Sequence, residues 1–293
     1  MNRIEKPILV DDRVAIDALS ANKRLKCYPH LGTYAKLIKG AYQQYISSNG
    51  NSRNINNVSL PQNIEEFLRD LYASPPSDIS FITRIRDESD VNCCPMCGSF
   101  HSGTLDHLLP KSVFPVFSIF SANLVPACKC NSKRSVEING AGGDERILHP
   151  YFDDILRNRL FVSCFDDLVR VPRVSLRLCI PSTDPFAPAV RFHLTHVVER
   201  TSVLRYMRKS WADLLRRPSL VAAELRMAPA SRAALVDILS LELDRQDDTH
   251  GSKNNWRSVF IAGLLDDHVI DWLMRAFHRP GWVADGPLVD GAV

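Results

Sequence analysis

The chain has 293 residues, of which 45% are hydrophobic and 24% are charged. This is the composition of a globular protein, and the length is enough for one large domain or several small ones. The formal net charge is only +3, and the sequence contains no basic tail or block. Charge alone therefore does not indicate nucleic-acid binding, which would depend on the local placement of basic residues.

The first residues, Met-Asn-Arg-Ile-Glu-Lys, lack the apolar core of a secretory signal. No stretch approaches the ~18 uninterrupted apolar residues that a membrane-spanning helix needs. We therefore expect a cytoplasmic protein that does not associate with membranes. Cytosolic thiols stay reduced, so a dense group of cysteines in such a chain favours metal binding over disulfides.

The first part of the chain reads as helical. Apolar residues recur at helical spacing over 34–45, and a second apolar stripe runs over 64–71. Asn63 is the expected N-cap of the second helix, with Glu66 at the capping-box position. Residues 1–90 are therefore predicted to form an N-terminal helical region.

The last part of the chain, residues 156–293, combines two periodicities. Apolar residues alternate with polar ones over 174–180 and over 190–194, which predicts a small antiparallel sheet or hairpin. Helical spacing returns in three later segments, 203–215, 235–243 and 256–277. We therefore predict an α+β fold that is mainly helical, with a central module at 91–155 between the two flanking regions.

Two close pairs of cysteines lie in the central module. Cys94 and Cys97 are separated by Pro-Met and followed by glycine, which suits a tight turn, and Cys128 and Cys130 have a one-residue spacer. Structural zinc takes four such ligands in a tetrahedron, so we predict a structural Zn²⁺ site on these residues. Cys93 would replace Cys94 if the latter were not a ligand. Cys128 is the weaker candidate, because a one-residue spacer gives the two sulfurs of this pair little conformational freedom.

The residues between and after these pairs add further chemistry. The stretch reads as strand, loop, strand and helix, with Asp106-His107 ending the first strand, Asn123 starting the second and Asn131 opening the helix. The carboxylate of Asp106 and the amide oxygen of Asn131 suit Mg²⁺ or Mn²⁺. His107 can take a proton from a water at neutral pH, and Asn123 is the candidate for holding its ring.

The sequence "LDHLLPKSVFP…NLVPACKCNSK" resembles the HNH endonucleases, whose ββα-metal core carries a histidine, a middle asparagine and a final histidine or asparagine. The resemblance covers residues 94–134. It is closest to the "DHxLPKxxFP" type of HNH nucleases in bacterial anti-phage defence systems, such as Septu-like and some retron systems. The later "ILHPYFDD" at 147–154 is also similar to that group. The second knuckle departs from the usual Cys-x-x-Cys-Asn, because here it is Cys-Lys-Cys-Asn.

The resemblance implies a ββα-metal module on a zinc knuckle within 91–155. In it, His107 is the general base and Asn123 orients its ring. Asp106 and Asn131 are implied ligands of a catalytic Mg²⁺ or Mn²⁺, and Asn131 stands where many members have histidine.

Further residues near these motifs have expected roles in binding. Lys111, Lys133 and Arg134 are predicted to contact phosphates. His149 follows a glycine-rich loop, and two roles remain open for it: a third ligand or phosphate contact at the site, or packing.

We predict a metal-dependent HNH endonuclease that hydrolyses DNA phosphodiester bonds, as the nuclease effector of a bacterial anti-phage defence system. The flanking helical regions are larger than a forty-residue core needs as support, so we expect them to bind a partner. The resemblance implies an ATPase subunit encoded alongside. The alternative function is a catalytically inactive zinc-knuckle adaptor that binds nucleic acid or protein.

Overall fold

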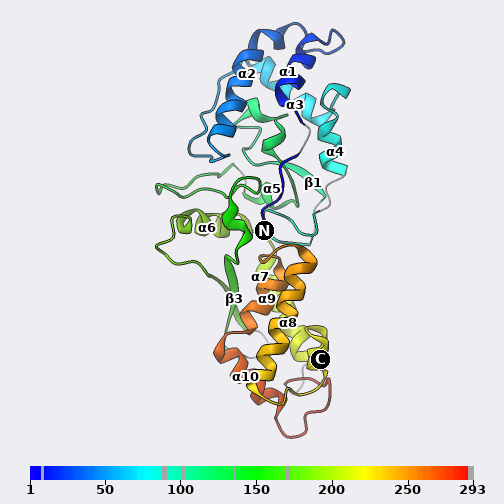
Figure 1. Ribbon diagram of the computed structural model, residues 1–293, viewed down its shortest axis with the longest axis vertical. Helices are drawn as coiled ribbons and strands as arrows, with labels where there is room; N and C mark the ends of the chain where they lie inside the picture. Colours follow the sequence, from blue (N-terminus) through cyan, green and yellow to red (C-terminus); the bar gives the residue numbers. More distant parts are fainter. Residues whose placement is uncertain (8–9, 88–90, 101–102, 135, 169–171, 290–293) are drawn as a thin grey trace.

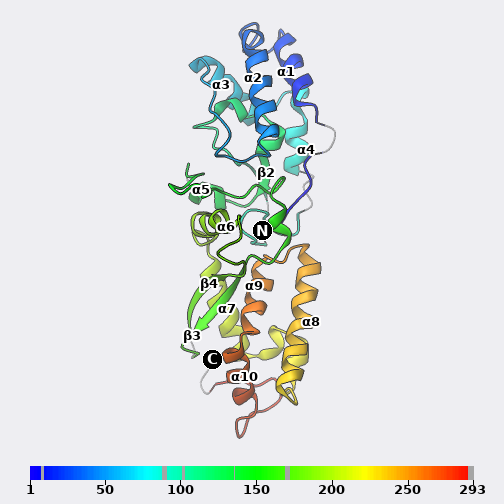
Figure 2. The same ribbon diagram turned by 60° about the vertical axis from the view of Figure 1, so that its left-hand side comes forward.

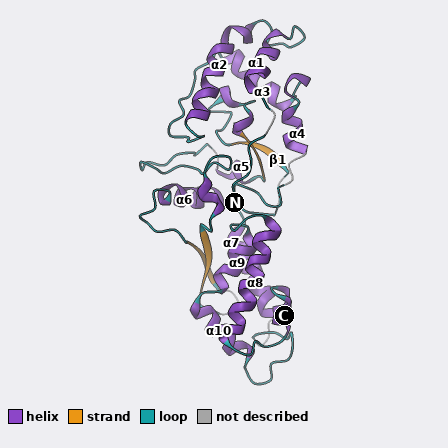
Figure 3. Ribbon diagram, in the orientation of Figure 1, coloured by secondary structure: helices purple, strands orange, loops and turns teal. Residues whose placement is uncertain are grey.

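The computed structural model describes residues 1–7, 10–87, 91–100, 103–134, 136–168 and 172–289. About half of the chain is helical, and the described residues contain two small antiparallel sheets (Figure 3). The prediction of a mainly helical α+β fold is therefore confirmed. Within the described ranges, no helix is long and apolar enough to cross a membrane.

The principal elements follow one another along the chain in this order: α1 (Asp12–Ala21), α2 (His30–Ser47), α3 (Gln62–Ala73), α4 (Phe81–Asp87), β1 (Thr104–His107), β2 (Leu124–Ala127), α5 (Cys130–Arg134), β3 (Phe161–Asp166), β4 (Arg173–Leu178), α6 (Ala187–His193), α7 (Val203–Arg216), α8 (Arg232–His250), α9 (Trp256–Leu264) and α10 (Asp267–Phe277). They form three tiers of an elongated molecule (Figures 1 and 2). Helices α1–α4 lie at one end, and α7–α10 lie at the other with β3 and β4. The first sheet, α5 and α6 lie between them.

The helices expected before residue 90 are present as α2 and α3. Helix α2 buries Ile38, Tyr42 and Tyr45 on the predicted apolar stripe. Helix α3 starts earlier than expected, because Pro61 occupies its N-cap position and Asn63 lies inside its first turn. Proline at the start of a helix loses no hydrogen bond and already has a fixed φ, which explains why Pro61 and not Asn63 is the N-cap.

The first sheet brings the predicted motif residues together. Strands β1 and β2 are antiparallel, with Asp106 opposite Val125 and His107 opposite Leu124. Helix α5 begins at Cys130, shortly after β2 ends. The predicted order of strand, loop, strand and helix is therefore confirmed. Because successive side chains of a strand point to opposite faces, Asp106 and His107 lie on opposite sides of this small sheet.

The second sheet confirms one of the two alternating runs. β4 coincides with the first run and pairs with β3, with Phe161 opposite Leu178. The second run is not a strand, because residues 190–193 lie in α6 and Leu194 begins the π-helical turn that follows. Pro188 in the first turn suits a helix start, and Val190 and Phe192 are buried together with most of their neighbours. Because α6 is buried on nearly all sides, its apolar residues show the alternating spacing of a strand although they form a helix.

Side chains connect the middle tier to both ends of the molecule. Tyr45 of α2 packs against Phe117 and Phe120 in the loop before β2, with ring centroids 5.1 Å apart in both cases. Both phenylalanines are buried in the core. From the other end, the indole Nε1 of Trp256 donates to the carbonyl of Cys97 at 2.8 Å. The central residues are therefore held from two sides.

Candidate functional site

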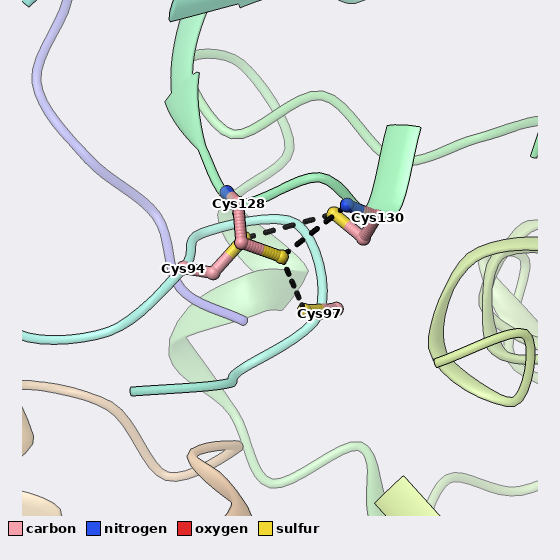
Figure 4. Close-up of side chains that lie close together, drawn as sticks. All are labelled: Cys94, Cys97, Cys128 and Cys130. Carbon is pink, nitrogen blue, oxygen red and sulfur yellow. Dashed lines mark hydrogen bonds between the residues drawn. The ribbon is translucent and has the colours of Figure 1, made fainter. Parts of the chain in front are cut away.

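The four cysteines of the two pairs converge in the middle tier (Figure 4). Their sulfur atoms all lie within 4.8 Å of one another. The sulfur of Cys94 is 3.7 Å from that of Cys130, and the sulfur of Cys97 is 3.5 Å from that of Cys128. Four sulfurs that bind zinc at ~2.3 Å in a tetrahedron lie ~3.8 Å apart. The cluster can therefore hold a zinc ion with all four positions filled by protein.

Local backbone geometry places these sulfurs. Gly98 has a φ of +78°, and a Cβ there would collide with the carbonyl of Asn254. The backbone N–H of Cys128 donates to the sulfur of Cys94, and the N–H of Cys130 donates to the sulfur of Cys128, both at 3.3 Å. Hydrogen bonding to Cys130 lowers the pKa of Cys128. Burial raises the pKa of Cys94, and hydrogen bonding to Cys128 raises that of Cys130. The backbone donors therefore position the sulfurs, and a bound zinc ion would favour the thiolate, the form in which cysteine binds metal.

Cys128 belongs to the cluster despite its one-residue spacer, whereas Cys93 does not belong to it. Cys93 is buried, and its sulfur lies 3.8 Å from the carbonyl oxygen of His250. The preference for Cys94 over Cys93 is confirmed, because Cys94 is the residue whose sulfur joins the group.

Asp106 and Asn131 form a second group of candidate metal ligands. Asn131 is only 4% exposed, and among the described residues the Oδ1 of its amide has no hydrogen-bond partner. The amide nevertheless lies close enough to the Asp106 carboxylate to favour its charged form. A buried polar group without a partner costs ~1–3 kcal/mol. A cation that took the amide oxygen and the carboxylate as ligands would remove that cost, so these residues fit Mg²⁺ or Mn²⁺.

Opposing effects act on the carboxylate of Asp106. Burial raises its pKa, and this is the dominant effect. The N–H of His107 donates to the carboxylate at 2.7 Å, and the positive charges of Arg134 and Lys111 also lower the pKa. A divalent cation would favour the ionised form further. The site is thus a half-buried carboxylate whose surroundings are already positive.

A backbone carbonyl holds the imidazole of His107. Its Nε2 lies 2.8 Å from the carbonyl oxygen of Ser118, which can only accept, so Nε2 carries the proton and Nδ1 keeps its lone pair. Burial lowers the pKa of His107 to about 4. The ring is therefore neutral at pH 7, which is the form that a general base requires.

Asn123 does not hold the ring of His107, which corrects one expectation. Its Oδ1 accepts from the N–H of Leu109 at 2.8 Å and from the hydroxyl of Tyr45 at 3.2 Å. Its Nδ2 donates to the carbonyls of Leu109 and Phe117, both at 3.1 Å. Asn123 thus closes the loop between β1 and β2. That loop carries the carbonyl that binds the imidazole, so the two side chains are linked only through it.

The three basic residues expected at phosphates lie in different surroundings. Arg134 is 1% exposed and donates to the carbonyls of His107 at 3.1 Å and Leu108 at 2.7 Å. It holds the end of β1 against α5, so the prediction that it contacts phosphate was wrong. Lys133 is exposed and lines a cavity beside the cysteine cluster. Lys111 is half-buried near the carboxylate of the candidate metal site.

His149 lies in the core and not beside the candidate ligands. It is fully buried, its Nδ1 accepts from the N–H of Tyr151 at 3.1 Å, and its Nε2 lies 2.9 Å from the hydroxyl of Tyr45. Burial lowers its pKa well below the usual value, so the ring is neutral. The structure therefore supports the packing alternative for this residue.

Residues of the N-terminal helices also reach the site, and the sequence did not predict them. The ring of Tyr72 on α3 stands edge-on to the ring of His107, with centroids 4.3 Å apart. The guanidinium of Arg86 on α4 lies over the Tyr72 ring, 5.5 Å from its centroid. Short motifs cannot mark such residues, because these contacts join segments that are distant along the chain.

Comparison with known proteins adds one partial similarity. No family model matches the chain, and no solved structure matches it. The chain is 36% identical over 62 residues to "Protein ea31" of Escherichia phage lambda, an alignment that covers 20% of this chain and 21% of the phage protein. The chain thus matches about a fifth of the length of this curated relative. This similarity concerns one segment and does not by itself show a family.

Proposed function

We propose that the protein is a metal-dependent endonuclease of the HNH type that hydrolyses DNA phosphodiester bonds. The observation that carries the proposal is the buried Asn131 amide, whose Oδ1 lacks a hydrogen-bond partner among the described residues and which lies beside the Asp106 carboxylate. The neutral imidazole of His107 follows in sequence on the same strand. The order β1, β2 and α5 on a four-cysteine cluster and the motif resemblance support the same function.

In this proposal Asp106 and Asn131 would hold a Mg²⁺ or Mn²⁺ ion. When bound, the ion supplies electrostatic stabilisation for the negative charge that develops on the phosphate and on the leaving 3′ oxygen. The amide and the carboxylate come from α5 and β1, so the two ligands are positioned by the packing of the helix against the strand. Arg134 keeps that packing fixed through the carbonyl of His107.

His107 takes the proton of the attacking water at Nδ1. The carbonyl of Ser118, 2.8 Å from Nε2, keeps the ring in the required tautomer and stabilises the imidazolium that forms. A pKa of about 4 makes the free imidazole a weak base. The negative charge of a bound phosphodiester favours the protonated ring, so it would raise this pKa toward the range in which proton transfer is efficient.

The cysteine cluster has a structural part in this proposal. Zinc with four protein sulfurs has no open position for substrate or water, so it would stabilise the fold without entering the reaction. It would join the turn before β1 to the start of α5, because its ligands come from both segments.

The test is cleavage of supercoiled plasmid DNA in Mg²⁺ or Mn²⁺ by the protein and by its His107→Ala variant. We expect the variant to lose at least ~10²-fold in rate, as removal of a general base does, while it keeps its zinc content and its circular dichroism. His278, exposed at the end of α10, provides the matched control, and His278→Ala should retain full activity. Equal cleavage by the His107→Ala protein would exclude the mechanism. A wild-type protein that binds DNA without cutting it would indicate the adaptor function.

We further propose that the helical regions on either side bind a partner, and that this partner is an ATPase encoded alongside in an anti-phage defence system. The resemblance of the central motif to defence nucleases supports this, and so does the net charge of +3, which is low for a nuclease that binds DNA tightly alone. Co-purification with the product of a neighbouring gene would support it. Full activity of the isolated protein would count against it.

A further inference from the structure

Tyr72 lies between the N-terminal helices and the candidate active site. Its ring stands against that of His107, with an interplanar angle of 62°. Its hydroxyl donates to the carbonyl of Leu105 on β1. These two contacts fix the position of the tyrosine relative to the strand that carries the candidate general base. The C-terminal half of α3 is thereby part of the wall around the site.

Two cationic side chains lie over this same aromatic ring. The ammonium of Lys111 is 4.4 Å from the ring centroid, and the guanidinium carbon of Arg86 is 5.5 Å from it. Lys111 follows β1, whereas Arg86 comes from α4, so the two charges reach the ring from different segments. Neither forms an ion pair with an acidic side chain of the described residues. Cation–π contacts of this kind contribute ~0.5–1 kcal/mol each and hold the cations in place.

This arrangement carries an electrostatic cost that an anion would remove. Burial is the main cause that lowers the pKa of Lys111, and the charges of Arg69 and Arg86 lower it further, while Asp106 opposes them. The chain thus holds like charges together on a half-buried tyrosine, beside the carboxylate of the candidate metal site. A phosphate group of a nucleic-acid backbone would pair with both cations and would lie next to the proposed catalytic residues.

We propose that Arg86 and Lys111, which lie over the ring of Tyr72, bind a backbone phosphate of the DNA. This phosphate is the neighbour of the phosphate whose bond is cleaved. This inference deepens the proposed function and rests on it. Helices α3 and α4 are then part of the substrate-binding surface and not only a region for a partner protein. The guanidinium of Arg86 supplies the planar donors that suit a phosphate, and Lys111 supplies a point charge.

Arg84 offers a matched control on the same helix. It has the same charge as Arg86 and is exposed. Residues two apart on a helix are rotated by about 200° around the axis, so the two arginines point in nearly opposite directions. Removal of either arginine changes the net charge by the same amount. A difference between the two variants therefore reports the position of the charge and not its loss.

The test measures the affinity of the protein for duplex DNA by fluorescence anisotropy over a range of salt concentrations. It uses the protein with His107 intact and with Ca²⁺ in place of Mg²⁺ or Mn²⁺ in the buffer, so that the DNA stays intact and the contact between His107 and Tyr72 is kept. Arg86→Ala should weaken binding at least ~10-fold and reduce the slope of log affinity against log salt by about 1, the value for one lost phosphate contact. Arg86→Lys should keep most of the slope, and Arg84→Ala should keep both affinity and slope.

In buffer with Mg²⁺ or Mn²⁺, Arg86→Ala should also lower kcat/KM for plasmid cleavage far more than Arg84→Ala does. Equal affinities and slopes for the two alanine variants would overturn the inference, even if the wild-type protein cleaves DNA. A wild-type protein that does not cleave, combined with a salt slope that depends on Arg86, would leave the phosphate site standing and remove the proposed nuclease activity. Thermal melting of each variant shows that a lost slope does not come from unfolding.

Discussion

Asn123 shows how one buried side chain can shape a site without contacting its chemistry. The imidazole of His149 is placed to donate through Nε2 to the hydroxyl of Tyr45, and that hydroxyl donates to Oδ1 of Asn123. The amide then binds both backbone groups of Leu109. Each such bond contributes only about 1 kcal/mol, but a buried group left without its partner costs ~1–3 kcal/mol. The chain of bonds therefore favours one conformation of the loop that holds His107.

Asp12 is half-buried, and the desolvation of its carboxyl group makes stability depend on pH. Its carboxylate accepts from the N–H of Ser121 at 2.8 Å and from its hydroxyl at 2.6 Å. Burial nevertheless raises the pKa of Asp12 from 3.8 to about 6. The folded protein therefore binds more protons than the unfolded chain between these values. The stability that protonated Asp12 contributes is full below pH 3.8 and is lost as the pH rises through about 6.

Replacement of this residue should remove that part of the pH dependence. We expect the free energy of unfolding of the wild type, minus that of Asp12→Asn, to fall by about 3 kcal/mol between about pH 3 and about pH 8. The other titrating groups are common to both proteins and cancel in the difference. Urea denaturation across this range measures it, and a difference that does not change with pH would contradict the prediction.

At the scale of elements, α5 depends on its contacts for its existence. A helix from Cys130 to Arg134 is far too short to be stable alone. Its first residue belongs to the cysteine cluster, and its last residue donates to the carbonyls at the end of β1. Zinc binding and the position of Asn131 are therefore coupled, because the same short helix carries both the sulfur of Cys130 and the amide.

The coupling predicts different effects for substitution of a cysteine inside the cluster and of a cysteine outside it. Cys128→Ser should weaken zinc binding by more than the ~10–100-fold that substitutions outside the ligand shell cost, and it should lower the melting temperature. Cys93→Ser removes a buried sulfur that lies outside the cluster and should keep the zinc. Zinc content after dialysis against a chelator measures both. Equal retention by the two variants would mean that Cys128 is not a ligand.

At the scale of the whole molecule, the C-terminal helices hold the cysteine turn from one side. Trp256 opens α9, and its indole and backbone N–H groups donate to the carbonyls of Cys97 at 2.8 Å and Gly98 at 3.1 Å. The side chain of Asn254 binds the segment before β3, donating to the carbonyl of Asn158 at 2.7 Å. The lower tier in Figure 1 is thus bonded directly to the backbone of the candidate zinc site.

Loss of the indole contact should therefore weaken the zinc site from a distance. Trp256→Phe leaves the Cys97 carbonyl without its donor, which should cost ~1–3 kcal/mol of stability and speed the removal of zinc by a chelator. Trp282 makes the same type of bond to the carbonyl of Gly286 at 3.1 Å, far along the chain from the cysteines. Trp282→Phe should leave the rate of zinc loss unchanged. If both variants lose zinc at the same rate, the proposed connection is absent.

The features that were predictable are those that depend on neighbours in sequence. The spacing of Cys94 and Cys97 around Pro-Met marks a tight turn wherever it occurs, and the alternation of a strand places Asp106 and His107 on opposite faces. The strand and helix around Asn131 were predictable for the same reason. Alternation failed at α6, because a helix buried on most sides can show the apolar spacing of a strand.

The sequence by itself determined the two cysteine pairs, the order of β1, β2 and α5, and the identity of the candidate metal-binding groups, whereas the structure decided that Cys94 and Cys128 belong to the cluster. Only the tertiary structure decided which residues meet across the chain. In the structure Asn123 binds the backbone of Leu109 and not the His107 ring, and Arg134 is buried in the core. The tertiary structure also brought Tyr72 and Arg86 to the site from separate helices. The reason is that local spacing fixes the direction of a side chain relative to its own element, whereas its partners depend on how distant elements pack.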